Sequence, residues 1–216
     1  KGPVSVAFDE LNTLAKSCGA RFRYEGVVMS GTPLLNMLKY GLAGCSVQKI
    51  EGILNGTTNF ILTKMNDNGY SYADALEEAT SLGYAEADPS GDVEGWDAAG
   101  KISILAKLIF GKNIPVSEID RQGITCVTSE KIKEANENGF AVKLIAALNM
   151  LNGMPYAYVA PKEIPLSHPL ASIKGATNAV SITTDNLGEV TLIGPGAGRR
   201  ETGQALLVDL IAMCKD

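Results

Sequence analysis

The chain has 216 residues, of which 45% are hydrophobic and 20% are charged, a composition that fits one or two globular domains with a sizeable core. Its formal net charge of -5, without runs of Lys or Arg, argues against a nucleic-acid partner, and no apolar run approaches the roughly 18 residues that cross a membrane. The four cysteines are far apart and there is one histidine, which argues against a zinc site and predicts reduced thiols in a cytoplasmic protein.

The first half of the chain alternates between helical and strand patterns. In chain order, the predicted elements are a helix at 3–17, a strand at 20–28, a helix at 33–43, a strand at 47–54 and helices at 57–69 and 71–83. The last two helices each end at a glycine, the commonest residue just after a helix. Ser71 and Asp74 form a variant of the capping box at the start of the helix at 71–83.

The second half begins with a long predicted helix over 93–110 that ends near Gly111, and a further helix is predicted at 128–139. Two hairpins follow: 140–151 pairs with 154–164 through a turn at Asn152-Gly153, and 179–196 forms the second. The last predicted element is a helix at 199–213. Strands and helices without strict alternation indicate an α+β fold, with a mixed β-sheet and helices packed on one face.

An acidic segment, YAEADPSGDVEGWDAAGK at 84–101, leads directly into the apolar run ISILAKLIF. On a helical wheel Asp97 and Lys101 lie on the line continued by Ile104 and Leu108, so the pair is predicted to point inward. An exposed pair of this spacing contributes only about 0.2–0.5 kcal/mol, which does not explain burying it. Two interpretations remain: a structural ion pair, or a lysine that a neighbouring carboxylate holds ready for proton transfer.

Two glycine-containing stretches suggest less. EGILNGTTNFIL at 51–62 predicts a strand, a turn at Asn55-Gly56 and a helix whose free backbone N–H groups suit an anion, although a threonine N-cap explains the same pattern. GPGAGRR at 194–200 lacks the spacing of a dinucleotide-binding loop. His168 accompanies no serine or cysteine nucleophile motif and is interpreted as a loop residue.

Four stretches together resemble the homoserine dehydrogenase family: YEGVVMSGTP, EGILNGTTNFIL, LGYAEADPSGDVEGWDAAGK and GPGAGRRETGQALL. They follow the family's order and cover its substrate-binding and catalytic domain nearly end to end. The resemblance implies the reversible NAD(P)-dependent interconversion of L-homoserine and L-aspartate 4-semialdehyde, in threonine, methionine and isoleucine biosynthesis. The opening KGPV resembles a segment that follows the family's nucleotide-binding domain, so the chain is expected to be separated from a longer enzyme.

The resemblance also implies roles for individual residues. Asp97 and Lys101 are similar to the family's acid and lysine near the reacting carbon, and Lys1 resembles a second catalytic lysine between substrate and nicotinamide. The implied substrate-binding residues are Glu86, Asp92, Gly56, Thr57 and Tyr84. These types suit the chemistry, because carboxylates bind the substrate ammonium, a helix start binds its carboxylate, and a lysine serves the oxygen that gains or loses a proton.

The remaining implications concern cofactors and assembly. NAD or NADP is expected to be held mainly by the nucleotide-binding domain, with Gly196, Ala197 and Gly198 near it. The family binds a monovalent cation, usually sodium, mainly through main-chain carbonyls, and the matching positions here are Glu25, Val28, Ser30 and Thr32. Residues 1–193 are expected to form the substrate-binding and catalytic domain, with 194–216 packing on the nucleotide-binding domain. A homodimer through the sheet is expected as well.

Alternative hypotheses remain at this point. The chain is either a dehydrogenase catalytic domain or a non-catalytic substrate-binding or dimerisation module that is inactive without a nucleotide-binding domain. A third hypothesis is a different amino-acid dehydrogenase of the same architecture. The loop that selects between NAD and NADP belongs to the nucleotide-binding domain, so these residues do not predict the preferred cofactor.

Overall fold

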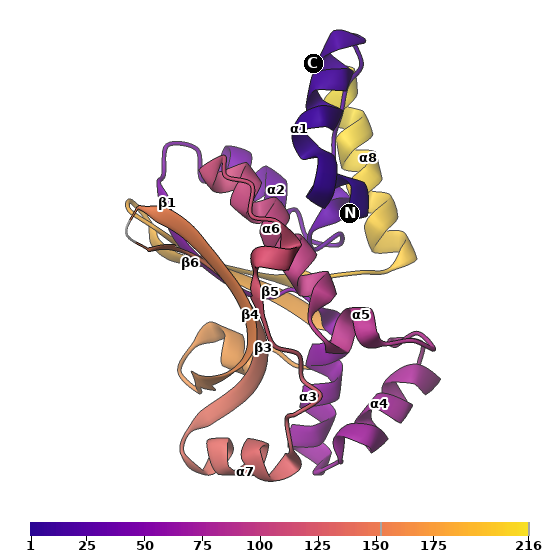
Figure 1. The fold of residues 1–216 in the computed structure, drawn as a ribbon, viewed down its shortest axis with the longest axis vertical. Coiled ribbons are helices and arrows are strands. Elements are labelled where there is room, and N and C mark those ends of the chain that lie inside the picture. The colour runs from indigo at the N-terminus through magenta and orange to yellow at the C-terminus, as the bar shows by residue number, and fades with distance from the viewer. Residues whose placement is uncertain (152, 216) are drawn as a thin grey trace.

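The strand β1 (Val47–Ile53) lies in the middle of a six-stranded sheet whose order is β2-β4-β3-β1-β5-β6 (Figure 1). The structure is a computed structural model and describes residues 1–151 and 153–215. The other strands are β2 (Asp120–Arg121), β3 (Phe140–Leu151), β4 (Met154–Pro165), β5 (Thr177–Thr184) and β6 (Gly188–Pro195). β2 runs parallel to β4 and the other described pairings are antiparallel, which confirms the predicted mixed sheet.

Helices precede, connect and follow these strands. They are α1 (Gly2–Ser17), α2 (Leu34–Asn36), α3 (Gly56–Asn68), α4 (Tyr72–Ser81), α5 (Ser90–Val93), α6 (Trp96–Phe110), α7 (Ser129–Glu137) and α8 (Arg199–Lys215), with short helical turns η1 (Glu25–Val27), η2 (Met37–Gly41), η3 (Val116–Glu118) and η4 (Pro169–Ser172). The predicted α+β fold is confirmed. No helix within the described ranges combines the length and the apolar character that a membrane span requires.

Local sequence signals account for most of these elements. Ser71 caps α4 through both hydrogen bonds of the capping box with Asp74, and Gly69 ends α3 in the left-handed conformation at a φ of 67°. Both predicted hairpins are confirmed as β3–β4 and β5–β6. The predicted turn at Asn152-Gly153 includes Asn152, which lies outside the described residues.

Three predicted elements need correction. The strand at 20–28 is wrong: residues 20–24 have no regular structure and η1 follows, because no described strand lies beside them to complete a ladder. The helix over 93–110 is divided into α5 and α6 by Gly95, whose φ of 85° favours glycine. The helix at 33–43 is one α-helical turn, α2, that continues as the π-helical turn η2.

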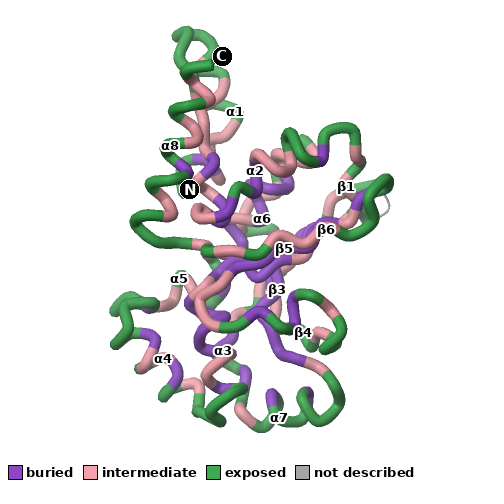
Figure 2. Tube along the Cα trace, turned by 180° about the vertical axis from the view of Figure 1, so that it is seen from behind, coloured by how far each residue is buried: buried purple, intermediate pink, exposed green. Residues whose placement is uncertain are grey.

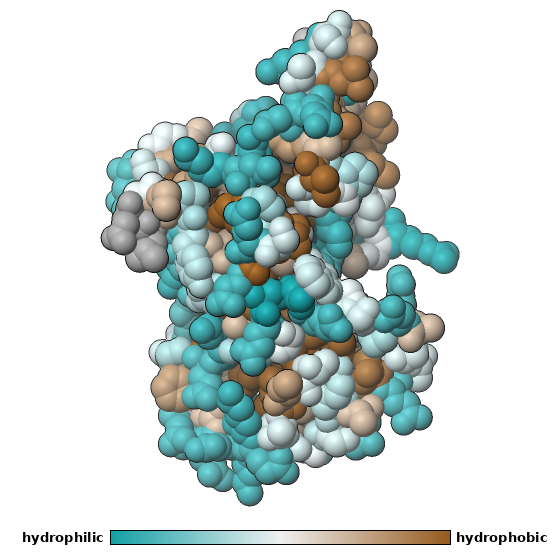
Figure 3. Space-filling model, in the orientation of Figure 1, coloured by the Kyte–Doolittle hydropathy of each residue, from teal (hydrophilic) through white to brown (hydrophobic). Residues whose placement is uncertain are grey.

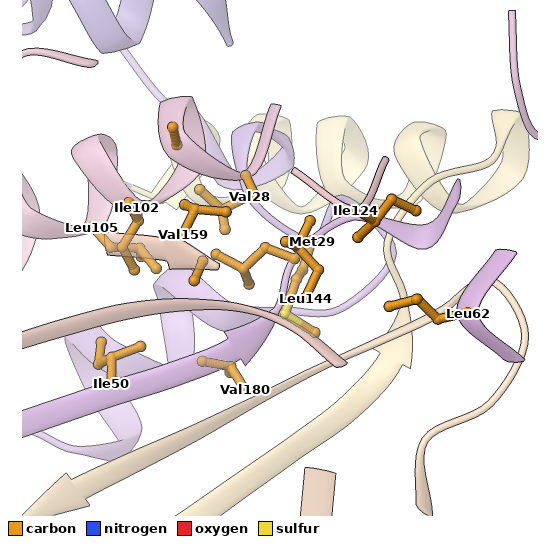
Figure 4. Close-up of a cluster of buried hydrophobic side chains, with 14 of the residues drawn as sticks. Val28, Met29, Ile50, Leu62, Ile102, Leu105, Ile124, Leu144, Val159 and Val180 are labelled. Carbon is orange, nitrogen blue, oxygen red and sulfur yellow. The ribbon is translucent and has the colours of Figure 1, made fainter. Parts of the chain in front are cut away.

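The main core lies between the sheet and α6 (Figure 4). Ile50, Leu144 and Val180 from the sheet and Ile102 and Leu105 from α6 are all buried there. Burying a side chain of this size contributes about 1.5–3 kcal/mol, so this layer fixes α6 on the sheet. Because Asp97 and Lys101 belong to α6, the same packing fixes their position.

The opposite side of the sheet, called here the second face, carries a smaller buried cluster. Ile53, Ile145, Ala147, Leu170, Ile173 and Ala179 form it, and η4 contributes one of them. Around this cluster the second face is open, with Tyr156 and Ile193 exposed. Outside the part that η4 covers, the second face is therefore a partly apolar surface on which Tyr156 and Ile193 are exposed.

The helices α1 and α8 lie side by side and project from the sheet at one end (Figures 1 and 2). Residues on them are mostly exposed, whereas buried residues concentrate along the sheet (Figure 2). Hydrophobic side chains gather on this projecting end (Figure 3). Large apolar side chains exposed there are Val6, Leu14, Leu206, Leu207, Leu210 and Ile211.

Candidate active site

Asp97 and Lys101 occupy the first two turns of α6, just after the break at Gly95. A carboxylate in the first turn interacts favourably with the positive end of the helix dipole. The Asp97 Oδ2 lies 2.7 Å from the Lys101 Nζ, and the side chains are only 13% and 12% exposed. The inward orientation predicted from the helical wheel is therefore confirmed.

Asp97 is the centre of a charged cluster formed by residues distant in sequence. Lys1 forms an ion pair with the Asp97 Oδ1, and the Asn55 Nδ2 donates to the Oδ2 at 2.9 Å. Burial would raise the pKa of Asp97, but the charge of Lys101 and hydrogen bonds from Lys1, Lys101 and Asn55 outweigh it and lower the pKa to about 2. The carboxylate is therefore ionised at every physiological pH.

Lys101 has a second acceptor besides Asp97. Its Nζ donates to the main-chain oxygen of Leu54 at 2.6 Å, at the end of β1. An ammonium group has three N–H donors, so these two bonds fix its position and leave one donor for a bound molecule. This arrangement suits a lysine that places a proton at a substrate oxygen.

Asn55 connects the strand end to the acidic segment, and the sequence did not predict this role. It caps α3 by accepting from the Thr58 N at 2.9 Å, while its Nδ2 donates to the Asp92 Oδ1 at 2.7 Å as well as to Asp97. The Asn-Gly pair before a helix signals the N-cap. No signal in the sequence indicates that the amide reaches two carboxylates near position 95.

A pocket of about 300 Å³ opens beside this cluster. It is lined by Lys1, Glu86, Asp88, Gly91, Asp92, Trp96 and Asp97. The structure thus brings together four residues whose roles the resemblance implies, and it adds Asp88, Gly91 and Trp96, which the sequence did not single out. A small pocket with four carboxylates suits a small polar molecule that carries an ammonium group.

Three predicted substrate residues lie next to the pocket rather than in its lining. Gly56 and Thr57 begin α3 directly after Asn55, and the Thr57 Oγ1 donates to the main-chain oxygen of Tyr84 at 2.7 Å. Tyr84 is exposed, and its ring contacts that of Phe60 at a tilt of 37° with centroids 4.8 Å apart. The free N–H groups at the start of α3 therefore begin one residue after Asn55, whose amide binds the carboxylates of Asp92 and Asp97.

A larger cavity of about 820 Å³ lies elsewhere, between residues 21–25, α2 and the C-terminal end of α6. Among the residues with predicted roles, only Glu25 lines it. Its size does not make it the site of chemistry, because Asp97, Lys101 and Lys1 line the smaller pocket or adjoin it. We therefore place the candidate active site at the pocket beside Asp97.

The four positions predicted to bind a cation lie in one tight loop. Met29 has a φ of 52°, and the Thr32 N donates to the Met29 oxygen at 2.7 Å, which closes the turn that contains Ser30. The carboxylate of Glu25 accepts from the main-chain N–H groups of Leu35 and Asn36 at 3.1 and 3.0 Å, so this side chain is already engaged. Within the described ranges, no group of three or more His, Cys, Asp or Glu side chains could hold a metal.

The turn Gly196–Ala197–Gly198 joins β6 to α8 and packs on that same loop. The Ser30 Oγ donates to the Gly196 oxygen at 3.2 Å, and Gly196 lies against the buried side chain of Asn178. Among the residues that the structure describes, neither side-chain amide atom of Asn178 has a hydrogen-bond partner. The predicted cofactor turn and the predicted cation loop are therefore neighbours, and neither lines the 300 Å³ pocket.

Comparison with known proteins gives consistent results. The family model described as homoserine dehydrogenase matches residues 33–211. The NAD(+)-dependent homoserine dehydrogenase of Pseudomonas canavaninivorans is 47% identical over 212 residues, which cover 98% of this chain and 60% of that protein. The chain thus spans little more than half of this relative.

Solved structures are similar as well. A homoserine dehydrogenase from Thiobacillus denitrificans superposes with a TM-score of 0.93 at 36% identity, covering 96% of this chain and 48% of that one. A hyperthermophilic archaeal homoserine dehydrogenase mutant in complex with NADPH has a TM-score of 0.84 at 38% identity, covering 99% and 62%.

Proposed function

Because the chain belongs to the homoserine dehydrogenase family, we propose that it forms the substrate-binding and catalytic part of an NAD(P)-dependent enzyme that interconverts L-homoserine and L-aspartate 4-semialdehyde. The observation that carries the proposal is the buried Asp97–Lys101 pair beside a small acidic pocket. The L-homoserine formed by this enzyme would feed the synthesis of threonine, methionine and isoleucine. Four free cysteines fit the cytoplasmic location that we propose.

Substrate binding follows from the charges around the pocket. Homoserine carries an ammonium and a carboxylate on the same carbon, and Glu86 and Asp92 supply negative charge for the ammonium. The first N–H groups of α3, at Gly56 and Thr57, supply donors for the carboxylate. This division orients the hydroxyl end of the substrate toward Asp97 and its lysine partners.

Proton transfer is assigned to Lys101. With two of its donors bound to Asp97 and to the Leu54 oxygen, the third is free to hold a proton at the substrate oxygen. The charge of Asp97 holds the ammonium group of Lys101 in place at its Oδ2. Lys1 contributes a second positive group at the Oδ1 of the same carboxylate. The nicotinamide, when bound, supplies or accepts the hydride.

The turn at 196–198 fits a contact with that cofactor. Gly196 lies against Asn178 and Gly198 against Glu201, so these two positions have no room for a side chain and can present their backbone to a ligand. The projecting α1–α8 end carries exposed apolar residues, which supports a contact of residues 194–216 with a nucleotide-binding part. The relatives are longer than this chain and can include such a part. We propose that this part holds most of the NAD or NADP.

Two further proposals concern an ion and a partner. The loop that contains Val28, Ser30 and Thr32 fits a monovalent cation bound through main-chain oxygens, and the unpartnered amide of the adjoining Asn178 supports an additional polar occupant there. The open second face supports a homodimer, because apolar residues such as Ile193 would be covered by a second copy.

The test replaces Lys101 in the chain joined to the nucleotide-binding part of a homoserine dehydrogenase. Lys101→Met is expected to lower kcat for homoserine oxidation by about 10²–10⁴-fold, the range for losing a positioned acid–base group. Lys107→Met is the matched control, because Lys107 lies on the same helix and pairs with the exposed Asp9. Full turnover in Lys101→Met with only a lower melting temperature would make the Asp97–Lys101 pair structural.

A further inference from the structure

Lys143 of β3 is a buried lysine that has no part in the chemistry proposed above. It is 5% exposed, and burial together with the charge of Lys174 lowers its pKa to about 8, against the opposite effect of Asp67. Burying an ammonium costs folding free energy unless its donors are well bonded. The position therefore carries a cost that an apolar residue in the same strand would avoid.

The contacts of Lys143 show what this residue holds. Its Nζ donates to the main-chain oxygen of Ile173 and to the Asn59 Oδ1 at 3.3 Å. The Asn59 Nδ2 donates in turn to the main-chain oxygens of Gly175 and Thr177 at 2.9 and 3.2 Å, and to that of Ile173 at 3.4 Å. One lysine and one amide thus hold the backbone of the 173–177 turn, which leads into β5.

The 173–177 turn supports the start of α3. A Cβ atom added to Gly56 would lie 2.7 Å from the main-chain oxygen of Ala176, so the first residue of α3 rests directly on the turn. About two turns further along the helix, the Thr63 Oγ1 accepts from the Gly175 N at 3.1 Å. Any shift of the turn therefore moves the backbone at Gly56.

We propose that Lys143 is a positioning residue for the carboxylate end of the substrate. It fixes the 173–177 turn, the turn fixes the first residues of α3, and their N–H groups meet the carboxylate. This inference rests on the proposed function and deepens it. Lys143 does not line the pocket and is not a catalytic residue, so its removal affects recognition of one end of the substrate and leaves the proton-transferring group in place.

Two substrates separate this role from a general structural one. L-homoserine carries the carboxylate, whereas 3-aminopropan-1-ol has the same ammonium and hydroxyl groups without it. In the chain joined to the nucleotide-binding part of a homoserine dehydrogenase, Lys143→Met is expected to lower kcat/KM for L-homoserine about 10–100-fold, mainly through KM, because small displacements of binding groups have effects of this size. The value for 3-aminopropan-1-ol is expected to stay within about twofold.

The matched control is Lys162→Met, because Lys162 lies opposite Lys143 on β4, on the same face of the sheet. This variant is expected to leave kcat/KM unchanged for both substrates. Thr63→Val removes the bond to the Gly175 N from the other side and is expected to act like Lys143→Met, so it decides the matter if Lys143→Met does not fold. An equal loss on both substrates, or an unchanged KM for L-homoserine, would overturn the inference. Failure of the unsubstituted enzyme to oxidise L-homoserine would instead overturn the proposed function.

Discussion

The buried carboxylate of Asp97 makes a quantitative prediction about folding that is separate from catalysis. Its pKa falls from the ordinary value of 3.8 to about 2 in the folded chain. Each pKa unit corresponds to about 1.4 kcal/mol, so the ionised group contributes roughly 2 kcal/mol to the free energy of unfolding. Because the folded pKa is the lower one, this contribution is complete above pH 3.8 and is lost as the pH falls through about 2.

Asp97→Asn is therefore expected to lower the free energy of unfolding by roughly 2 kcal/mol at pH 7, and by about half as much at pH 3. Leaving Lys101 without its carboxylate in a nearly buried position adds to the loss at neutral pH. Urea unfolding of the chain, followed by circular dichroism at pH 3, 5 and 7, measures both values.

Asp9→Asn is the control for this experiment. The Asp9 carboxylate lies 2.6 Å from the Nζ of Lys107, which belongs to α6 like Asp97, but the Asp9 side chain is 71% exposed. Solvent screening therefore limits the loss of unfolding free energy in Asp9→Asn to about 0–1 kcal/mol. Equal losses in Asp97→Asn and Asp9→Asn at pH 7 would refute the reasoning from burial. A loss in Asp97→Asn that did not shrink between pH 5 and pH 3 would refute the assignment of the low pKa.

Three other predictions follow from the same structure. Glu86→Gln is expected to raise KM for L-homoserine about tenfold with little change in kcat, because binding the ammonium is common to the ground and transition states; steady-state kinetics would contradict this if kcat fell instead. Lys143 has a lowered pKa, so the folded chain loses its proton near pH 8 while the unfolded chain keeps it. The free energy of unfolding, measured relative to that of Lys143→Met, is therefore expected to rise by roughly 2 kcal/mol between pH 7 and 10. Urea titrations that show no such rise would place the lysine in water. Light scattering of the chain is expected to give a dimer of the 22.7 kDa unit, and Ile193→Arg on the second face is expected to give a monomer; a monomer without the substitution would exclude this interface.

Elements whose signals are local could be predicted from the sequence. The capping box at Ser71, the left-handed Gly69 and the alternation in both hairpins act within a few residues, and the structure contains all of them. The strand predicted at 20–28 shows the limit of such signals, because alternation makes a segment fit for a sheet but a neighbouring strand must complete its ladder. Gly95 shows another limit, since a glycine inside a helical pattern is tolerated in many helices and ends this one.

Contacts between distant residues could not be predicted from spacing. The i, i+4 pair of Asp97 and Lys101 is visible on a helical wheel, whereas the contact of Lys1 with Asp97 joins residues 96 positions apart. The family resemblance implies a role for Lys1 but not this contact. The amide of Asn55 gave no sign that it reaches Asp92. Lys143 was hidden for a different reason: it lies within an apolar strand, where the pattern predicts burial but not what a buried lysine would bind.

The central position of β1 has a consequence for how the chain acquires its structure during synthesis. Its two neighbours, β3 and β5, emerge only after residues 140–151 and 177–184 have been made, although β1 itself ends at Ile53. At a translation rate of ~5–20 residues per second, the strand has both edges unpaired for several seconds. Throughout that interval the apolar residues of β1 lack the strands that cover its edges in the folded chain, which makes this segment the part of the sheet longest open to aggregation.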